Sequence, residues 1–280
     1  KRIYPTFRYE DIKKINVEHA DDWITSMKNN PEITTNMIRV ARKTAIQLFE
    51  HARKKRYVET NIFKDSESVK HKKAKLRPLT SAETILMLEN AKEDKYGIIW
   101  SLLLKTGMRV GESLALTWDD IKFNEKEITI NKQYTNGLFK DTTKTESGER
   151  KIIISEELNK DLMKHYTDQN LYNIQNNLNS NLVFANEVGN YLNLSNLRDR
   201  HFTPLLKKSG ITDRIRIHDL RHTFASINLN DNVAPTIISN YLGHSSPRVT
   251  MEVYADWIND VGESPSTTLE NILKEVDINN

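Results

Sequence analysis

Two histidines and an arginine lie close together in the segment 217–224, and their spacing suits a helix. His218, Arg221 and His222 would share one face of that helix, because residues three and four apart are neighbours. Histidines at i and i+4, with Asp219 between them, could form half of a zinc site. Arg221 would then place a fixed positive charge beside the metal, and no spacing in the chain indicates a third ligand. We therefore expect neither a metal nor another cofactor.

Further polar residues lie where helices or strands are expected to break. Arg109 stands in a glycine-flanked turn, and Lys144 lies beside an expected hairpin turn. His244 comes at a helix break, and Tyr254 follows ten residues later. Arg109 and Arg221 could stabilise the charge on a pentacoordinate phosphorus without a metal ion. The set therefore suits the transfer of a phosphodiester.

Taken in order, these residues resemble the signature of the tyrosine recombinase (phage integrase) family, which is Arg, Lys, His-x-x-Arg, His or Trp, and Tyr. The likeness spans nearly the whole chain. It implies a site-specific recombinase of a mobile element, such as a phage, a genomic island or a conjugative transposon. The arm-binding domain that such integrases often carry is expected to be absent here. The catalytic residues that the resemblance implies are Arg109, Lys144, His218, Arg221, His244 and Tyr254.

The resemblance also implies a reaction course. Tyr254 forms a 3′-phosphotyrosyl link, a 5′ hydroxyl later reseals the strand, and exchange passes through a Holliday junction. A tyrosine, with an ordinary pKa of about 10, must lose its proton as it attacks, and His218 is a suitable acceptor. Lys144 is a suitable proton donor to the leaving 5′ oxygen, and His244 can hydrogen-bond a non-bridging oxygen.

Alternatives remain open at this stage. The chain could relax DNA as a type IB topoisomerase does, or bind DNA as a regulator without catalysis. The regulator would lack a member of the signature, and none is missing. Lys140 and Lys151 are rivals of Lys144, which the Lys-Thr-x-x-Gly-x-Arg pattern favours. His222 is expected to have a structural role, and Glu112 to brace its own turn.

Composition limits the class of protein. The chain has 280 residues, enough for roughly two domains of about 150 residues each. It has no cysteine, which excludes a disulfide scaffold, a thiolate zinc site and a cysteine nucleophile. Its apolar stretches are too short to span a bilayer. The resemblance implies a cytoplasmic, nucleoid-associated bacterial protein. Residues 1–78 hold 19 Lys and Arg against 10 Asp and Glu, which indicates a polyanionic partner.

This basic first part is predicted to be helical. Asn16 can cap a helix that ends before Pro31, and residues 36–57 predict a second helix. The apolar stripe of the second helix consists of Ala41, Ala45, Leu48 and Ala52. We predict a helical core-DNA-binding domain over residues 1–69 and a basic linker over 70–78. The expected phosphate contacts are Arg39, Lys43, Arg53, Lys70, Lys72, Lys73 and Lys75.

Residues 79–260 are predicted to form the catalytic domain. A buried helix is expected from Ile98 to Leu104, ending at Gly107, and helices are expected again from Asp219 onward, with breaks at prolines and glycine. The other expected elements are a strand at 127–131, a hairpin with arms 139–145 and 150–155, and an Asn-rich surface loop or frayed helix end at 169–181.

The predicted fold class is mainly α with a small antiparallel β-sheet. The helical core-DNA-binding domain and the mixed α/β tyrosine-recombinase catalytic domain would form a clamp around DNA. The expected partners are double-stranded DNA attachment sites, further copies of the chain in a dimer or tetramer on DNA, and DNA-bending or excision accessory proteins. Residues 261–280 predict a short tail helix that is marginal alone and must dock on another surface. The resemblance implies docking on a neighbouring subunit, and docking on the chain's own domain stays open.

Overall fold

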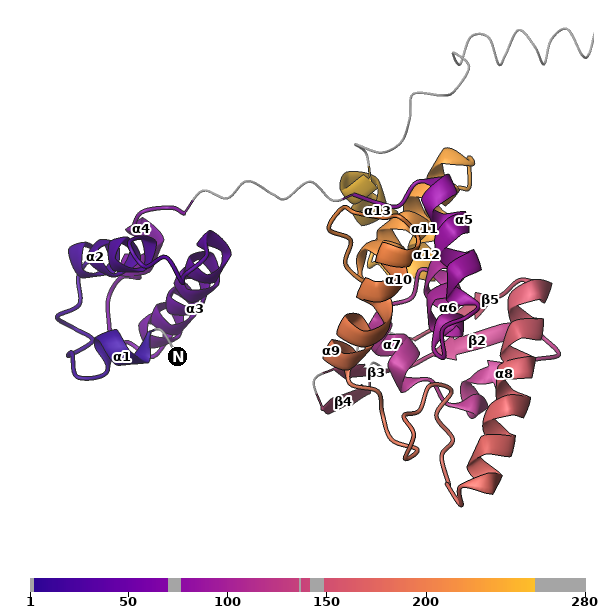
Figure 1. Cartoon of the computed structure of the whole chain (residues 1–280). Coiled ribbons are helices and arrows are strands. Elements are labelled where there is room, and N and C mark those ends of the chain that lie inside the picture. The colour runs from indigo at the N-terminus through magenta and orange to yellow at the C-terminus, as the bar shows by residue number, and fades with distance from the viewer. Residues whose placement is uncertain (1–2, 70–76, 136, 142–148, 255–280) are drawn as a thin grey trace, which may run out of the picture. The chain divides into compact units, whose positions relative to one another are not determined.

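The computed structural model describes residues 3–69, 77–135, 137–141 and 149–254. The chain divides into two compact units, Lys1–Lys75 and Leu76–Asn280, each with a hydrophobic core of its own (Figure 1). No helix in these described ranges is long and apolar enough to cross a membrane.

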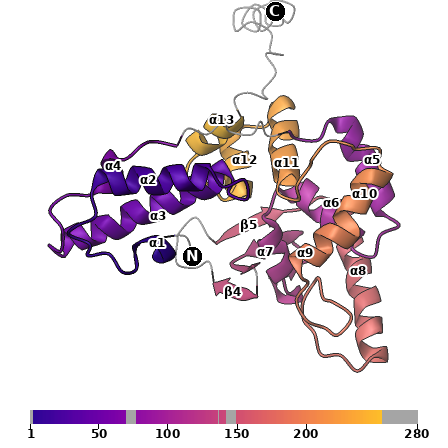
Figure 2. The same cartoon turned by 60° about the vertical axis from the view of Figure 1, so that its left-hand side comes forward.

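The first unit is built from helices that begin at capping side chains. Its described helices are α1 (Tyr4–Phe7), α2 (Val17–Lys28), α3 (Thr35–Lys54) and α4 (Ile62–Asp65). The Asn16 side chain accepts a hydrogen bond from the backbone N–H of His19, and the Thr34 side chain accepts one from Met37. The helices predicted after Asn16 and across residues 36–57 are therefore confirmed, and Figure 2 shows them side by side as α2 and α3.

An aromatic cluster forms the core of this unit. The ring centroid of Phe63 lies 5.7 Å from that of Trp23 and 4.8 Å from that of Phe49. The prediction that Leu48 belongs to the buried stripe of α3 is wrong, because Leu48 is 49% exposed and Phe49 is buried in its place. The larger ring of Phe49 removes more apolar area from water, so packing against Phe63 turns that position inward.

The second unit begins with three helices. They are α5 (Ser81–Ala91), α6 (Gly97–Thr106) and α7 (Val110–Ala115). The predicted end of the buried helix at Gly107 is confirmed. Gly107 has a φ of +65°, and its N–H donates to the carbonyl of Leu103 at 2.9 Å. This left-handed residue closes α6 and lets the chain turn into α7.

Two small antiparallel sheets follow the short 3-10 turn η1 (Trp118–Asp120). One contains β1 (Ile121–Lys122), β2 (Glu127–Ile130) and β5 (Arg150–Ile153), and the other β3 (Lys132–Thr135) and β4 (Leu138–Asp141). The predicted strand at 127–131 is confirmed as β2. The predicted hairpin between 139–145 and 150–155 is wrong for the described residues, because β4 pairs with β3 and β5 with β2. This register places Ile152 opposite Ile128, and both are fully buried.

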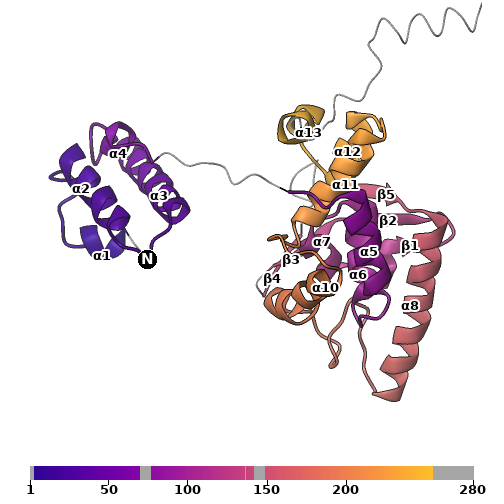
Figure 3. The ribbon, with the colours of Figure 1, turned by 45° about the horizontal axis from the view of Figure 1, so that its top comes forward.

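The long helix α8 (Glu156–Gln175) runs beside the three-stranded sheet (Figure 3). It continues through residues 169–175, where the Asn-rich sequence predicted a loop or a frayed end. Tertiary contacts explain the difference. The Trp118 ring N–H donates to the Gln169 side chain at 2.8 Å, and the Asn173 amide donates to the carbonyl of Ser180 at 3.3 Å. Such contacts outweigh the weak helix propensity of asparagine.

The described chain ends in a group of helices that carry Arg221 and Tyr254 and are flanked by His218 and His244. They are α9 (Leu194–Leu197), the π-helical turn η2 (Arg198–Phe202), α10 (Thr203–Lys208), α11 (Asp219–Asn230), α12 (Pro235–Leu242) and α13 (Pro247–Tyr254). The predicted helix breaks at Pro235, Gly243 and Pro247 are confirmed. Figures 1 and 3 show α11, α12 and α13 together at one end of the second unit.

Replacing Gly107 with alanine is expected to lower the free energy of unfolding by about 3 kcal/mol. The added Cβ would lie 2.4 Å from Cδ1 of Phe224 and 2.8 Å from Cδ2 of Leu242, at a φ of +65°. Gly210→Ala is the matched control, because Gly210 has a φ of +71° with no atom within 4 Å of the added Cβ. We expect it to cost only about 1 kcal/mol, and urea unfolding measures both. Equal losses would show that crowding at Gly107 contributes nothing.

Candidate active site

Arg221 connects three separate segments of the second unit. It lies on α11 and is only 4% exposed. Its Nη1 donates to the carbonyl oxygen of Gly107 at 2.9 Å, and its Nη2 donates to that of Leu242 at 2.5 Å. One guanidinium thereby joins the turn that carries Arg109 to the turn that carries His244. Burial and the positive charge of Arg109 lower the pKa of Arg221 to about 9, and it stays protonated at neutral pH.

Arg109 is held in its turn by Glu112. The backbone N–H of Arg109 donates to Oε2 of Glu112 at 2.8 Å, and its Nη1 donates to Oε1 at 2.8 Å. The Glu112 side chain is 3% exposed, whereas that of Arg109 is 39% exposed. The prediction that Glu112 braces this turn is confirmed, and part of the Arg109 side chain faces solvent.

A second arginine, Arg150, also reaches Glu112. Its Nη1 and Nη2 donate to Oε1 and Oε2 of Glu112 at 3.1 and 2.7 Å, and its Nε donates to the carbonyl of Tyr241 at 2.7 Å. Sequence reasoning did not single out Arg150. Its place at the end of the Lys-Thr-x-x-Gly-x-Arg pattern was the available signal, but nothing in the pattern indicates a partner 38 residues earlier.

The three histidines of this region differ in their surroundings. His218 precedes α11 and is exposed, while His222 is 8% exposed, and their rings meet edge to face at 5.0 Å. His244 follows α12, and its Nδ1 lies 2.8 Å from Oγ1 of Thr250. Burial lowers the pKa of His222 to about 4, helped by His218, and burial and Arg221 lower that of His244 to about 4. Both rings are therefore neutral at pH 7.

Tyr254 ends the described part of the chain in a buried position. It is 1% exposed and belongs to an apolar cluster with Phe224 and Leu242. Its hydroxyl lies 3.0 Å from Nδ1 of His222, within hydrogen-bond distance. Burial raises the pKa of Tyr254 to about 12, although the charge of Arg221 opposes the shift. The contact with His222 was not predicted, and its position four residues after His218 was the available signal.

The structure therefore brings together five of the six residues predicted to be catalytic. The charges of Arg109 and Arg221 both act on His218 and His244, and that of Arg221 acts on Tyr254. The sixth residue, Lys144, lies outside the described residues. Among the side chains that the structure describes, no group of three or more His, Cys, Asp or Glu could hold a metal ion.

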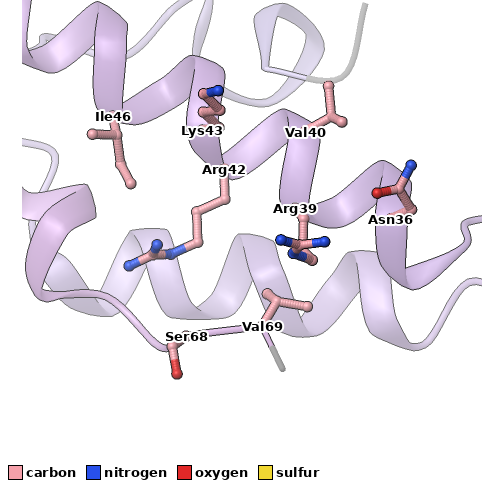
Figure 4. A pocket seen from close by; sticks show the side chains of 8 residues that line it. All are labelled: Asn36, Arg39, Val40, Arg42, Lys43, Ile46, Ser68 and Val69. Atoms are coloured by element: carbon pink, nitrogen blue, oxygen red, sulfur yellow. The ribbon is translucent and has the colours of Figure 1, made fainter. Parts of the chain in front are cut away.

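The residues predicted to contact DNA lie in or after the first unit. Arg39 and Lys43, one turn apart on α3, help to line a pocket of about 390 Å³ (Figure 4). Arg42, in the same lining, donates from Nε to Oγ of Ser66 at 3.2 Å. Arg53 forms an ion pair with Glu50 at 2.7 Å instead of lining the pocket. The predicted contacts Lys70, Lys72, Lys73 and Lys75 lie outside the described residues.

Comparison with known sequences finds relatives that are named as recombinases and integrases. One is a XerC-like tyrosine recombinase of Caldanaerobacter subterraneus, which is 28% identical over 69% of this chain and 54% of its own length. Another is the prophage integrase IntR of Escherichia coli, 24% identical over 74% of this chain and 54% of its own length. The chain thus spans just over half the length of these relatives.

Solved structures of similar fold include two integrases in complex with DNA. The Tn1549 transposon integrase with a circular intermediate DNA matches with a TM-score of 0.71 and 21% identity, covering 94% of this chain and 86% of that one. A lambda integrase dimer on a core site matches with a TM-score of 0.64 and 19% identity, covering 94% and 86%. The model of the phage integrase family matches residues 77–258, well over half of the chain. The chain therefore belongs to the phage integrase family.

Proposed function

We propose that this chain performs site-specific DNA recombination as the integrase of a mobile element. The observation that carries the proposal is the placement of Arg221, which hydrogen-bonds the turn before Arg109 and the residue that ends α12 just before His244. The charges of Arg221 and Arg109 both act on the neutral ring of His244, and the charge of Arg221 also acts on Tyr254. This arrangement suits an anionic, pentacoordinate phosphorus.

In the proposed reaction, the Tyr254 hydroxyl attacks a backbone phosphorus. The bond between Oη and phosphorus forms, and the bond from phosphorus to the 5′ oxygen breaks. The hydroxyl proton passes to His218, and Lys144 gives a proton to the leaving 5′ oxygen. Arg109, Arg221 and His244 bind the non-bridging oxygens. Attack by a 5′ hydroxyl of the partner strand reverses these steps and reseals the DNA through a Holliday junction.

The position of Tyr254 adds one requirement to this scheme. Tyr254 is 1% exposed and its hydroxyl makes a buried contact, so the hydroxyl cannot meet a DNA phosphate unless α13 moves before cleavage. His222 holds the hydroxyl at 3.0 Å in the described state, and its ring meets that of His218 edge to face. We propose that DNA binding exchanges the contact with His222 for the contact with the phosphate.

We further propose that residues 1–69 form the core-DNA-binding domain, 70–78 the linker and 79–260 the catalytic domain. The first unit would bind the duplex through the basic side chains of α3. The tail over 261–280 would join subunits of a dimer or tetramer on DNA, and accessory bending or excision proteins would act with it. The division of the chain into the units Lys1–Lys75 and Leu76–Asn280 and the family match over residues 77–258 support the domain assignments.

The proposal is tested with nicked duplexes that carry the junction sequences of the mobile element. Wild-type protein is expected to form an adduct that survives SDS and disappears with protease, with EDTA present and without ATP. Mass spectrometry of the DNA-linked peptide should place the DNA on Tyr254 through a 3′ phosphate. Binding of the same DNA without any adduct would favour a regulator and overturn the proposal. Relaxation of plasmids with no junction sequence would favour a topoisomerase.

Replacing Arg39 and Lys43 together with alanine is expected to weaken DNA binding and its salt dependence. Each lost phosphate contact should reduce the slope of log affinity against log salt by about 1, hence about 2 for the double variant. Arg53→Ala is the comparison, because Arg53 is already paired with Glu50 at 2.7 Å, and we expect a smaller change. Fluorescence anisotropy between 50 and 200 mM salt measures the slopes. An unchanged slope in the double variant would remove both residues from the interface.

A further inference from the structure

Arg150 is a buried cation that the reaction scheme does not use. Its side chain is 8% exposed, at the first residue of β5. All three of its nitrogens donate hydrogen bonds, two to the carboxylate of Glu112 and one to the carbonyl of Tyr241. A buried ion pair is costly to desolvate, and apolar residues of similar volume often stabilise a protein as well or better. Stability alone is therefore a weak reason for an arginine at this position.

Glu112 is shared between Arg150 and Arg109. Its Oε1 accepts from Nη1 of both arginines, at 3.1 and 2.8 Å, and its Oε2 accepts from Nη2 of Arg150 and the N–H of Arg109. Burial alone would raise the pKa of Glu112, but the hydrogen bond and charge of Arg150, followed by the charge of Arg109, lower it. Arg150 thereby helps to keep Glu112 ionised, and the Arg109 guanidinium gives Glu112 only the hydrogen bond from Nη1.

Arg150 also shapes the turn that leads to His244. The carbonyl of Tyr241 accepts its Nε at 2.7 Å, two residues before Gly243. A Cβ added to Gly243 would lie 3.0 Å from Nη1 and 3.2 Å from Cζ of Arg150, so the guanidinium packs directly on this turn. Gly243 has a φ of +62°, and His244 follows it immediately. The position of His244 therefore depends on the same side chain that shares Glu112 with Arg109.

The charges around Glu112 favour an anion. Arg109, Arg150 and Arg221 contribute three positive charges, and the carboxylate neutralises one. The charges of all three arginines act on His244. A neutral residue in place of Arg150 would leave a single net positive charge and would draw Arg109 fully onto Glu112.

We propose that Arg150 is a positioning residue for strand cleavage, which shares Glu112 with Arg109 and holds the turn of His244 so that both side chains meet one phosphate. This inference rests on the proposed recombinase function. Arg150 touches no DNA in the scheme and acts through Glu112 and the Tyr241 carbonyl.

The test compares Arg150→Met, Arg150→Lys and a matched control in single-turnover cleavage of the nicked duplex at saturating protein. Lys132→Met is the control, because it breaks another partly buried ion pair, between Lys132 and Asp120 at 2.7 Å, in which neither Glu112 nor Arg109 takes part. We expect Arg150→Met to cleave about 100-fold to 1,000-fold more slowly, with DNA affinity changed less than about threefold. Arg150→Lys, which cannot pair bidentately, should recover only part of the rate. Lys132→Met should stay within about threefold of wild type.

A second substrate separates positioning from folding. A methylphosphonate at the cleaved position replaces one negatively charged oxygen with a methyl group. Less negative charge then develops at the phosphorus, and cleavage depends less on the alignment of the arginines. The deficit of Arg150→Met should shrink to less than about tenfold on that substrate, because the demand for charge is lower. An equal deficit on both substrates, or no deficit on either, would overturn the inference. If the wild-type protein forms no adduct, the proposed function fails together with this inference. If the wild-type protein forms the adduct and the Arg150 variants cleave as fast as it does, only this inference fails.

Discussion

Replacing Tyr254 with phenylalanine is expected to abolish the covalent adduct, with cleavage at least about 10,000-fold below wild type. The loss removes the nucleophilic oxygen and leaves the ring in place. The ring packs in a buried cluster with Phe224 and Leu242, so the helix α13 should keep its position. The contact between the hydroxyl and His222 at 3.0 Å is lost, at a cost of about 1 kcal/mol in unfolding free energy. DNA affinity should change less than about threefold.

Tyr241→Phe is the matched control for Tyr254→Phe. Tyr241 lies in the last turn of α12, and its hydroxyl donates to the carbonyl of Ile153 at 2.9 Å. This variant also loses one tyrosine hydroxyl and one hydrogen bond, and it should form the adduct at a rate within about threefold of wild type. SDS gels of protein bound to labelled DNA measure both variants. A persistent adduct with Tyr254→Phe would place the nucleophile on another residue.

The elements that the sequence predicted well are those with a local signal. Gly107 and Gly243 end helices because left-handed backbone favours glycine, and Asn16 caps α2 through a bond to a residue three positions on. The predictions that were wrong concern elements whose burial or pairing depends on a residue distant in the sequence. Phe49 is buried in place of Leu48 because Phe63 packs on it, and β5 pairs with β2 because Ile128 and Ile152 share the core.

The same division holds for the site. The side chains with chemistry were recognisable from their types and order, but the contacts that hold them were not. Arg221 donates to the main-chain carbonyls of Gly107 and Leu242, 114 and 21 residues away, and every residue carries such a carbonyl. These hydrogen bonds therefore cannot be predicted from the residue types in the sequence. The pairing of Arg150 with Glu112 across 38 residues escaped for a related reason, since ion pairs of this range depend on the tertiary fold.

Replacing Arg221 with lysine is expected to slow cleavage by about 1,000-fold, the second largest effect. Lysine keeps the positive charge but has one nitrogen, so it cannot reach the carbonyls of Gly107 and Leu242 together and also contact a phosphate. A carbonyl left without its donor in a buried place costs about 1–3 kcal/mol, and we expect the unfolding free energy to fall by about 2 kcal/mol. The affinity for DNA should fall less than about fivefold, because charge is retained.

Arg198→Lys controls for the exchange itself, since the Arg198 side chain is 57% exposed and pairs with Asp199 at 2.7 Å. It should leave cleavage and stability unchanged within about twofold and 0.5 kcal/mol. Single-turnover adduct formation, urea unfolding and DNA anisotropy on the same preparations separate the three effects of Arg221→Lys. If Arg221→Lys cleaves within tenfold of wild type, the guanidinium does not stabilise the phosphorus. Slow cleavage with near-normal DNA binding would instead show that the reaction requires the shape of the guanidinium as well as its charge. The two carbonyl bonds of Arg221 would then serve to hold that shape in place.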